Sequence, residues 1–163
     1  MNLYSGGEIP EEVGKVLSVL QEKDIPYQLR IFDQPAHHAR QAAALLGCKL
    51  GAVVKSLILQ AENNGDFVLV LVSGKNRVDL QLIKKILGMQ VKIADPAVVF
   101  RRTGYPVGAV PPFGLKVKLP VIIDADLLDY PYLWASAGDT QALVGMASEA
   151  LPLVLDARVC AIH

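Results

Sequence analysis

The sequence has few cysteines, no long apolar segment and no excess of charge of either sign. Cys48 and Cys160 stand far apart and form no CxxC or cysteine–histidine spacing, which argues against a disulfide framework or a structural zinc site. The longest unbroken apolar run covers residues 67–72, far short of the roughly 20 residues that a membrane-spanning helix needs. These features therefore predict no structural zinc site and no membrane-spanning segment. We also expect no cofactor.

The charge balance limits the kind of partner. Sixteen basic side chains match sixteen acidic ones, so the formal net charge is zero. A neutral protein is unsuited to coating long nucleic acids, although a local basic patch can still hold a short end. Residues 1–12 contain no basic segment followed by an apolar one, so we expect no secretory signal and a cytoplasmic protein.

Length and composition favour a single domain over residues 1–163. Hydrophobic residues make up 52% of the chain and charged residues 20%, which is too apolar and too weakly charged for disorder. No internal repeat or low-complexity linker divides the sequence. We therefore expect one unit with one substantial core.

Local patterns predict an alternation of helices and strands. The predicted helices cover residues 10–20, 37–47, 78–88, 95–104 and 148–155. The predicted strands cover residues 26–33, 52–60, 66–72, 89–94, 121–126, 132–138 and 157–163. The turn-rich residues 61–65 favour a hairpin between the second and third of these strands. This order of elements indicates an α+β domain with a mixed sheet.

Lys55 interrupts an otherwise apolar strand pattern. Side chains alternate between the two faces of a strand, so Lys55 shares a face with Val53, Leu57 and Leu59. A buried ammonium needs a partner, because an unpaired buried charge is costly. Two interpretations remain open: the lysine reaches water at the rim of the sheet, or it points into a cleft and binds an anion or a carbonyl oxygen.

Residues 103–120 are rich in glycine and proline, which is unsuited to a helix or a central strand and predicts a shaped loop. Glycine lets a backbone approach a ligand closely, and proline stiffens the loop so that its N–H groups stay aimed. Gly104, Gly108 and Gly114 in this loop, with Gly138 further on, are therefore candidate oxyanion-hole positions. Taken separately, each glycine is better explained as a turn device.

Several motifs together resemble the YbaK/EbsC family, which includes free-standing aminoacyl-tRNA deacylases related to the editing domain of bacterial prolyl-tRNA synthetases. The order is VVKSLIL, SGKNRVDL, the loop, LPVIIDADLL and WASAGD, and the similarity runs from about residue 12 to the C-terminus. The most specific motif is T-G-Y-x-x-G-x-x-x-P-F-G, which this chain matches from residue 103 to residue 114.

The resemblance implies a compact barrel-like mixed sheet flanked by helices, and metal-independent hydrolysis of the ester between an amino acid and the tRNA 3′ end. Water attacks a carbonyl polarised by backbone N–H groups, and the hydroxyl of the terminal adenosine assists. Lys55 would position the substrate and stabilise charge. The predicted catalytic positions are Lys55, Gly108 and Gly138. The predicted substrate-binding residues are Phe32, Thr103, Gly104, Tyr105, Pro112, Phe113, Gly114, Ser136 and Asp139.

The sequence departs from the family pattern at three places. The family often reads G-G-x-S-P where this chain has residues 108–112, so a loop hydroxyl is missing. Members that clear cysteine tend to carry a tyrosine where Phe32 falls and an acid where Leu143 falls. Both changes remove polar groups, which predicts a preference for another small amino acid such as alanine.

Other polar residues are weaker candidates. His37 and His38 at a helix start are more often solvated or capping groups than ligands. Asp124 and Asp126 could pair as acid and base, but Asp124 at a strand end is better explained by hydrogen bonding. Lys75 and Arg77 are the basic residues beside the pocket strand, and we expect them to meet acceptor-end phosphates of tRNA.

The leading hypothesis from the sequence is a trans-editing deacylase for a mischarged tRNA, with proline tRNA carrying a small amino acid such as alanine or cysteine as the expected substrate. Its expected partner is the acceptor end of aminoacyl-tRNA, with prolyl-tRNA synthetase as a second candidate. An alternative is a non-catalytic module of the same fold that recruits tRNA or a synthetase, which the missing loop hydroxyl favours. A third reading is a structural or small-ligand protein in which Lys55 only reaches water.

Overall fold

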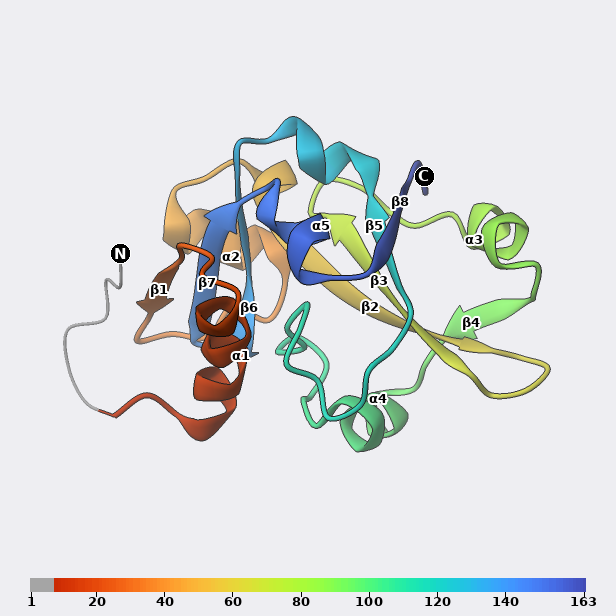
Figure 1. The fold of residues 1–163 in the computed structure, drawn as a ribbon, viewed down its shortest axis with the longest axis horizontal. Coiled ribbons are helices and arrows are strands. Elements are labelled where there is room, and N and C mark those ends of the chain that lie inside the picture. Colours follow the sequence, from red (N-terminus) through yellow and green to blue (C-terminus); the bar gives the residue numbers. More distant parts are fainter. Residues whose placement is uncertain (1–7) are drawn as a thin grey trace.

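Two β-sheets organise the chain in this computed structural model, which describes residues 8–163 (Figure 1). The prediction of no secretory signal concerns residues 1–12, most of which lie outside the described residues. Within residues 8–163 the five helices are α1 (Glu11–Glu22), α2 (Ala39–Leu46), α3 (Leu80–Leu87), α4 (Pro96–Thr103) and α5 (Ala150–Val154). Two 3-10 turns are η1 (Leu50–Ala52) and η2 (Ala125–Asp129).

Within the described residues, every strand except β7 lies close to a position that the sequence predicts, and β7 was not predicted as a strand. They are β1 (Gln28–Ile31), β2 (Val54–Ala61), β3 (Phe67–Ser73), β4 (Val91–Ile93), β5 (Val121–Asp124), β6 (Tyr132–Asp139), β7 (Ala142–Ala147) and β8 (Ala157–Cys160). β2 and β3 form the predicted antiparallel hairpin. β5 pairs in parallel with β3 and with β8, so this sheet is mixed, and the α+β prediction is confirmed.

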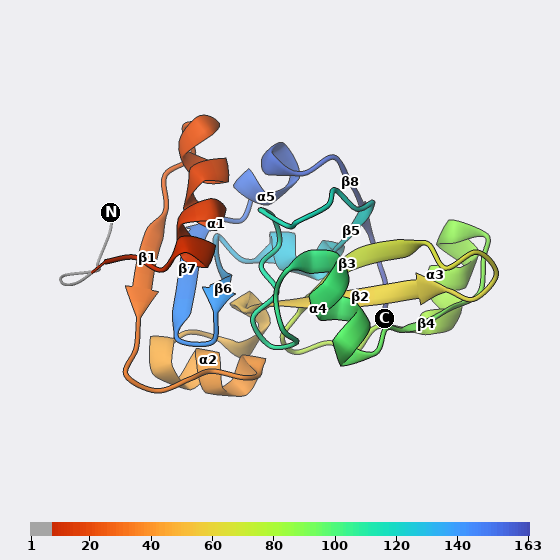
Figure 2. The same cartoon turned by 90° about the horizontal axis from the view of Figure 1, so that it is seen from below.

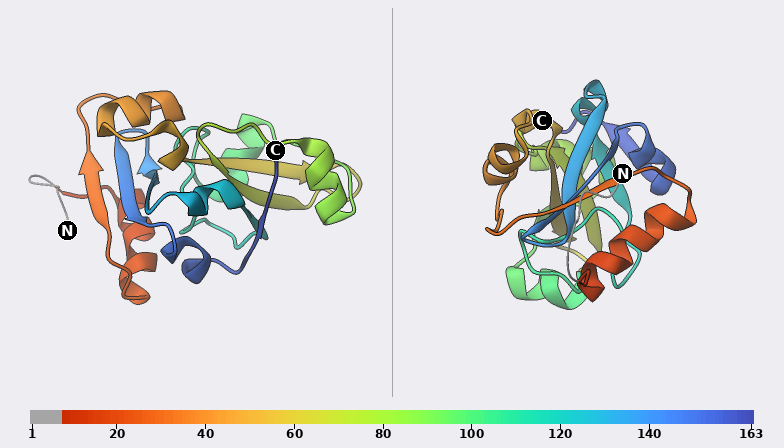
Figure 3. Two further views of the ribbon diagram at one scale, coloured as in Figure 1. Left: turned by 90° about the horizontal axis from the view of Figure 1, so that it is seen from above. Right: turned by 90° about the vertical axis from the view of Figure 1, so that its left-hand side faces the viewer.

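The strands divide into a three-stranded sheet, in the order β1-β7-β6, and a five-stranded sheet, in the order β4-β2-β3-β5-β8. A single parallel bridge between Val53 and Trp134 connects them. The expected barrel-like sheet is therefore corrected to two sheets that form no closed barrel within residues 8–163. The smaller sheet lies with α1 and α2 at one end of the molecule, and the β2–β3 hairpin extends with α3 and β4 at the other (Figures 2 and 3).

Local signals explain several helix ends. α2 ends at Gly47 and α3 ends at Gly88, with φ of 68° and 71°, the left-handed geometry that glycine adopts without steric cost. Asp79 begins α3, where its side chain accepts hydrogen bonds from the backbone N–H groups of Gln81 and Leu82. Pro96 occupies the first turn of α4, as its fixed φ favours.

Three buried clusters hold the sheets and helices together. The largest joins α1 to the inner faces of both sheets and includes Leu17, Leu69 and Val144. The second packs α3 against the outer face of the five-stranded sheet through Ile83 and Leu59. The third packs α2 against both sheets where they meet. Across residues 8–163, no helix has both the length and the apolar character that crossing a bilayer requires.

Candidate active site

A cleft of about 540 Å³ opens beside the first half of β2. β4 pairs only with residues 59–61 of β2, so β4 leaves the preceding part of that strand edge uncovered. The start of α2, the loop after α4, and strands β6 and β7 supply the other walls. Residues that line it include Lys55, Ser56, Arg77, Gly108, Ser136 and Leu143.

The uncovered edge of β2 presents backbone groups to this cleft. Ala61 N–H donates to Asp66 on the hairpin side, whereas Ile58 C=O accepts from Ala94 N–H on the β4 side, at 3.0 Å. Backbone groups of successive residues in an antiparallel strand point to opposite sides. The N–H and C=O of Ser56 therefore point the same way as those of Ile58, toward the cleft.

Lys55 is half-buried beside this edge, on the cleft wall. Its Nζ donates a hydrogen bond to the backbone carbonyl oxygen of Asn76. Burial lowers the pKa of Lys55, the positive charge of Arg77 lowers it further, and the negative charge of Asp124 opposes both effects. A partly desolvated cation interacts more strongly with a carbonyl oxygen or an anion than a solvated one does.

The rest of the cleft is mainly apolar. Val53, Val54 and Leu143 contribute buried aliphatic side chains, and Ala39 and Ala42 of α2 contribute small ones. An apolar pocket with a few placed polar groups is the usual form of a small-molecule site. This one suits a small apolar group next to a carbonyl that Lys55 can reach.

The glycine- and proline-rich loop closes the cleft on the side of α2. Val107, Gly108 and Val110 line it. Gly108 has φ of 90°, and a Cβ atom there would lie 3.1 Å from the carbonyl oxygen of His37. Glycine at this position therefore permits both the backbone turn and the close contact with the segment that precedes α2.

Comparison with known proteins agrees with this geometry. Residues 33–153 match the family described as the aminoacyl-tRNA editing domain. That match covers most of the chain and includes the residues that line the cleft. The chain belongs to the aminoacyl-tRNA editing domain family.

Individual relatives of this editing domain include free-standing and synthetase-borne proteins. The chain is 26% identical over 118 residues to the multifunctional Ser/Thr-tRNA deacylase ProXp-y of Escherichia coli, which covers 71% of this chain and 70% of that protein. It is 36% identical over 103 residues to a proline–tRNA ligase of Desulfovibrio desulfuricans, and this match covers 63% of this chain and 17% of the ligase. A crystal structure described as a candidate trans-editing enzyme for prolyl-tRNA synthetase superposes with a TM-score of 0.87, at 32% identity over 95% of this chain and 98% of that one.

The most specific motif of the sequence lies mainly inside the editing domain rather than on the cleft. Thr103, Tyr105 and Phe113 are buried. The Tyr105 hydroxyl donates to the carbonyl oxygen of Gly114 at 3.1 Å and lies 3.4 Å from that of Glu12 in α1. Thr103 Oγ1 donates to the carbonyl oxygen of Val99 at 2.8 Å. These contacts fix the path of the loop.

Gly104 and Gly114 also take part in the loop's own geometry. Gly104 ends α4 with φ of 84°. A Cβ atom on Gly114 would lie 3.3 Å from the backbone of α1 at Lys15 and Val16. Pro112, Phe113 and Gly114 line a second cleft, of about 570 Å³, next to α5 and on the other side of the loop.

Ser136 and Gly138 lie together on β6. Ser136 lines the cleft, and its Oγ accepts a hydrogen bond from the N–H of Gly138 at 3.2 Å. That N–H is therefore engaged by the neighbouring side chain. Gly138 has φ of 99°, and a Cβ atom there would lie 2.8 Å from Cε1 of Tyr105 and 3.0 Å from the carbonyl oxygen of Glu12. In this structure its glycine character serves the packing of β6 against α1.

Three other predicted residues lie beside the cleft rather than on its wall. Phe32 packs against the cluster that includes Leu143, and Arg30 lies over its ring at 5.0 Å. Asp139 Oδ1 accepts from the N–H of Gln141 at 2.8 Å in the turn between β6 and β7. Lys75 lies 3.9 Å from Asp126, so of the two predicted phosphate-binding residues only Arg77 lines the cleft.

His37 and His38 are only weak candidates from the sequence, and Asn76 is not a candidate there at all. Both histidines line the cleft, because the segment before α2 folds against Gly108. Asn76 supplies the carbonyl oxygen that accepts from Lys55. Adjacent histidines and an asparagine in a turn carry no distinctive pattern, so only their positions in the fold identify them.

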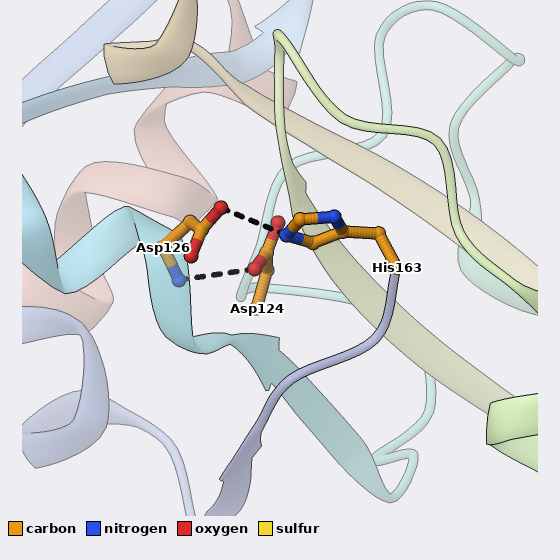
Figure 4. Close-up of side chains that lie close together, drawn as sticks. All are labelled: Asp124, Asp126 and His163. Carbon is orange, nitrogen blue, oxygen red and sulfur yellow. Dashed lines mark hydrogen bonds and ion pairs between the residues drawn. The ribbon is translucent and has the colours of Figure 1, made fainter.

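Asp124, Asp126 and His163 form a group of potential metal ligands (Figure 4). Their polar atoms are already used by the protein: Asp124 Oδ1 accepts from the N–H of Asp126 at 3.0 Å, and His163 Nε2 lies 2.9 Å from Asp126 Oδ2. Hydrogen bonds from Asn76 and His163 hold the pKa of Asp126 below its ordinary value. The group is explained as a hydrogen-bond network, as expected for Asp124.

Proposed function

We propose that this editing domain hydrolyses, in trans, the ester that joins a small amino acid to a tRNA, with proline tRNA mischarged with alanine as the preferred substrate. The observation that carries the proposal is the half-buried ammonium of Lys55 on the wall of a small, mainly apolar cleft. The similarity to a proline–tRNA ligase and to ProXp-y supports the reaction class.

In this proposal Lys55 binds and orients the ester, and its charge stabilises the negative charge that develops on the carbonyl oxygen. The N–H of Gly108 adds a donor from the loop, and the exposed edge of β2 at Ser56 holds the backbone part of the amino acid. Water adds to the carbonyl carbon. The bond from that carbon to the ribose oxygen then breaks, and the ribose oxygen takes a proton. The terminal adenosine's neighbouring hydroxyl assists the water.

Specificity follows from the size and polarity of the cleft. Leu143, Val53 and Val54 offer no hydrogen-bond partner from their side chains, so an alanine methyl fits them better than a serine hydroxyl. A missing methylene is worth only about 1 to 3 kcal/mol in an apolar site. We therefore expect alanine to be preferred over serine, and cysteine to be a weaker competitor.

The nucleic-acid part of the substrate would meet the mouth of the cleft. Arg77 lines the cleft, and the planar guanidinium of this side chain suits a phosphate. Lys75 is partly engaged by Asp126 and by the ring of Tyr130, 5.6 Å from its Nζ. Arg77 is therefore the stronger phosphate contact in this proposal, and Lys75 the weaker.

The test is hydrolysis of proline tRNA charged with alanine, cysteine, serine or proline, by wild type and by Lys55→Ala. We expect rapid clearance of the alanine ester and a loss of about 100-fold or more in the variant, since one such electrostatic contact is typically worth that much. Lys84→Ala, an exposed lysine on α3, is the matched control and should match wild type.

The other outcomes discriminate between functions. Clearance that survives in Lys55→Ala would overturn the assigned role of Lys55. Absence of hydrolysis with every ester, together with retained tRNA binding, would favour the non-catalytic module. Absence of both would favour the small-ligand interpretation.

A further inference from the structure

Asp124 is fully buried at the end of β5, although it carries a carboxylate. Its Oδ2 accepts hydrogen bonds from the N–H of Ser73 at 3.0 Å and from Nδ2 of Asn76 at 2.9 Å. Its Oδ1 accepts from the N–H of Asp126 at 3.0 Å. A buried charge is tolerated only when such donors replace water, so the carboxylate fixes the groups that surround it.

Hydrogen bonds hold both the side chain and the backbone N–H of Asn76. Its Nδ2 donates to Asp124 and also to Asp126 Oδ2, each at 2.9 Å. Its own N–H donates to the carbonyl oxygen of Ser73 at 2.9 Å, which closes the turn after β3. Only 9% of Asn76 is exposed, so the turn has little freedom to move. The carbonyl group of Asn76 is therefore fixed in direction.

That carbonyl oxygen accepts the hydrogen bond from Lys55 Nζ. The contacts thus run without interruption from Asp124, through the side chain and carbonyl of Asn76, to the ammonium on the cleft wall. A free lysine side chain loses rotamer entropy when it is ordered, and reacting groups must be held close to their productive positions. Anchoring the ammonium before substrate arrives reduces that loss at the moment of binding.

We infer that Asn76 and Asp124 are positioning residues for Lys55: Asp124 fixes Asn76, and the Asn76 carbonyl aims the Lys55 ammonium at the ester. This inference rests on the proposed function, because Lys55 is its central substrate contact. The negative charge of Asp124 also favours the charged form of Lys55 against burial and against Arg77.

The experiment follows Lys55 directly by NMR of protein labelled with ¹³C at lysine Cε, with the signal assigned from Lys55→Arg. Wild type, Asn76→Ala and Asp124→Asn are titrated with pH, and Asn64→Ala, in the exposed turn between β2 and β3, is the matched control. We expect Asp124→Asn to lower the pKa of Lys55, because the opposing negative charge is removed. Asn76→Ala should move the Lys55 signal toward that of a solvated lysine.

Deacylation is measured on the same proteins, corrected for the folded fraction from urea unfolding. We expect kcat to fall roughly 10- to 100-fold in Asn76→Ala with a smaller change in KM, as for a misplaced group. In Asp124→Asn the alkaline limb of the pH profile should move to lower pH. Asn64→Ala should leave each quantity unchanged.

The two proposals fail in different ways. If the wild type hydrolyses no ester, the proposed function fails, whereas the NMR titration still decides whether the network holds Lys55. If Lys55 titrates and resonates in both variants as in wild type, the positioning role is overturned, even where activity falls. A loss of activity that only follows the folded fraction would equally overturn it, in favour of a purely structural network.

Discussion

The loop at residues 103–120 has two sides with different properties. On one side Val107 and Gly108 border the cleft that holds Lys55, and Val107 is 57% exposed. On the other side Tyr105 and Phe113 are buried against α1 and the sheets. The residues that make the sequence motif most specific thus belong mainly to the buried side, whereas the residues that line the cleft belong to the other.

A specific motif can therefore mark a scaffold rather than a substrate contact. Tyr105 ties the loop to itself and to α1, which sets where Gly108 and its neighbours lie. A change on the buried side should therefore act on stability first. A change on the cleft side should act on the substrate and leave stability almost unaltered.

The largest expected effect is that of Phe113→Ala. Phe113 is 4% exposed within the main core, so the substitution leaves a large cavity. We expect the free energy of unfolding to fall by about 3 to 5 kcal/mol in urea denaturation. Val107→Ala, on the cleft side of the same loop, is the control and should change it by less than about 0.5 kcal/mol. Equal losses in the two variants would break the comparison.

Gly138→Ala should have the next largest effect. The added Cβ would approach Tyr105 to 2.8 Å and the Glu12 backbone to 3.0 Å, at φ of 99°. We expect a loss of about 2 to 3 kcal/mol. Gly88→Ala has φ of 71° with nothing within 4 Å, so its cost of about 1 kcal/mol isolates the backbone term. If Gly138→Ala unfolds at the same urea concentration as wild type, β6 and α1 can move apart without a cost in stability.

Tyr105→Phe tests the hydrogen bonds of the buried side alone. Burial raises the pKa of Tyr105, so its hydroxyl stays a donor at neutral pH. Removing it leaves the carbonyl oxygen of Gly114 without this partner and should cost about 1 kcal/mol. Tyr27→Phe, which loses an exposed bond to Gln21, should cost less. If both variants unfold at the same urea concentration, the Tyr105 hydroxyl does not hold the loop.

Lys55→Met should have the smallest effect on stability, in the opposite direction. Burial and Arg77 lower the pKa of Lys55 in the folded state, so the unfolded chain holds that proton more tightly. Wild-type stability should therefore rise as pH increases from the lowered pKa toward the ordinary value of 10.5. The neutral variant should be slightly more stable than wild type at pH 7. This difference in the free energy of unfolding should shrink as the pH approaches 10.5.

Urea midpoints at pH 7 and near pH 10.5 measure this difference, and Lys84→Met is the matched control. A Lys55→Met protein that is less stable than wild type at neutral pH would mean that the bond to Asn76 outweighs the cost of burial. Lys55 would then belong with the scaffold side of the comparison.

Much of the secondary structure could be predicted from local patterns. The apolar runs of β2 and β3 and the turn between them predict the hairpin, and Gly47 and Gly88 mark where α2 and α3 end. The Asp95–Pro96 pair predicts the start of α4, although within the described residues the Asp95 side chain makes no capping hydrogen bond. These features depend on neighbours a few residues apart, which a sequence displays directly.

The site was only partly predictable. Lys55, Arg77, Gly108 and Ser136 lie on one cleft, as the motifs indicate, but glycine and proline alone cannot reveal which side of a loop faces a ligand. Tyr105 and Phe113 were therefore expected at the substrate and lie in the core. His37 and Asn76 reach the site through contacts between segments far apart in the chain.

Local sequence patterns were sufficient for most of the elements, the mixed α+β character and the family, because hydrophobic periodicity, turn residues and motif order can be recognised along the chain. Only the tertiary structure shows that β4 stops short of the first half of β2, that the start of α2 lines the cleft left there, and that Asp124 fixes Asn76 against Lys55. The physical reason is that burial and hydrogen-bond direction depend on which distant segments meet, and these set the environment of the one lysine in that strand.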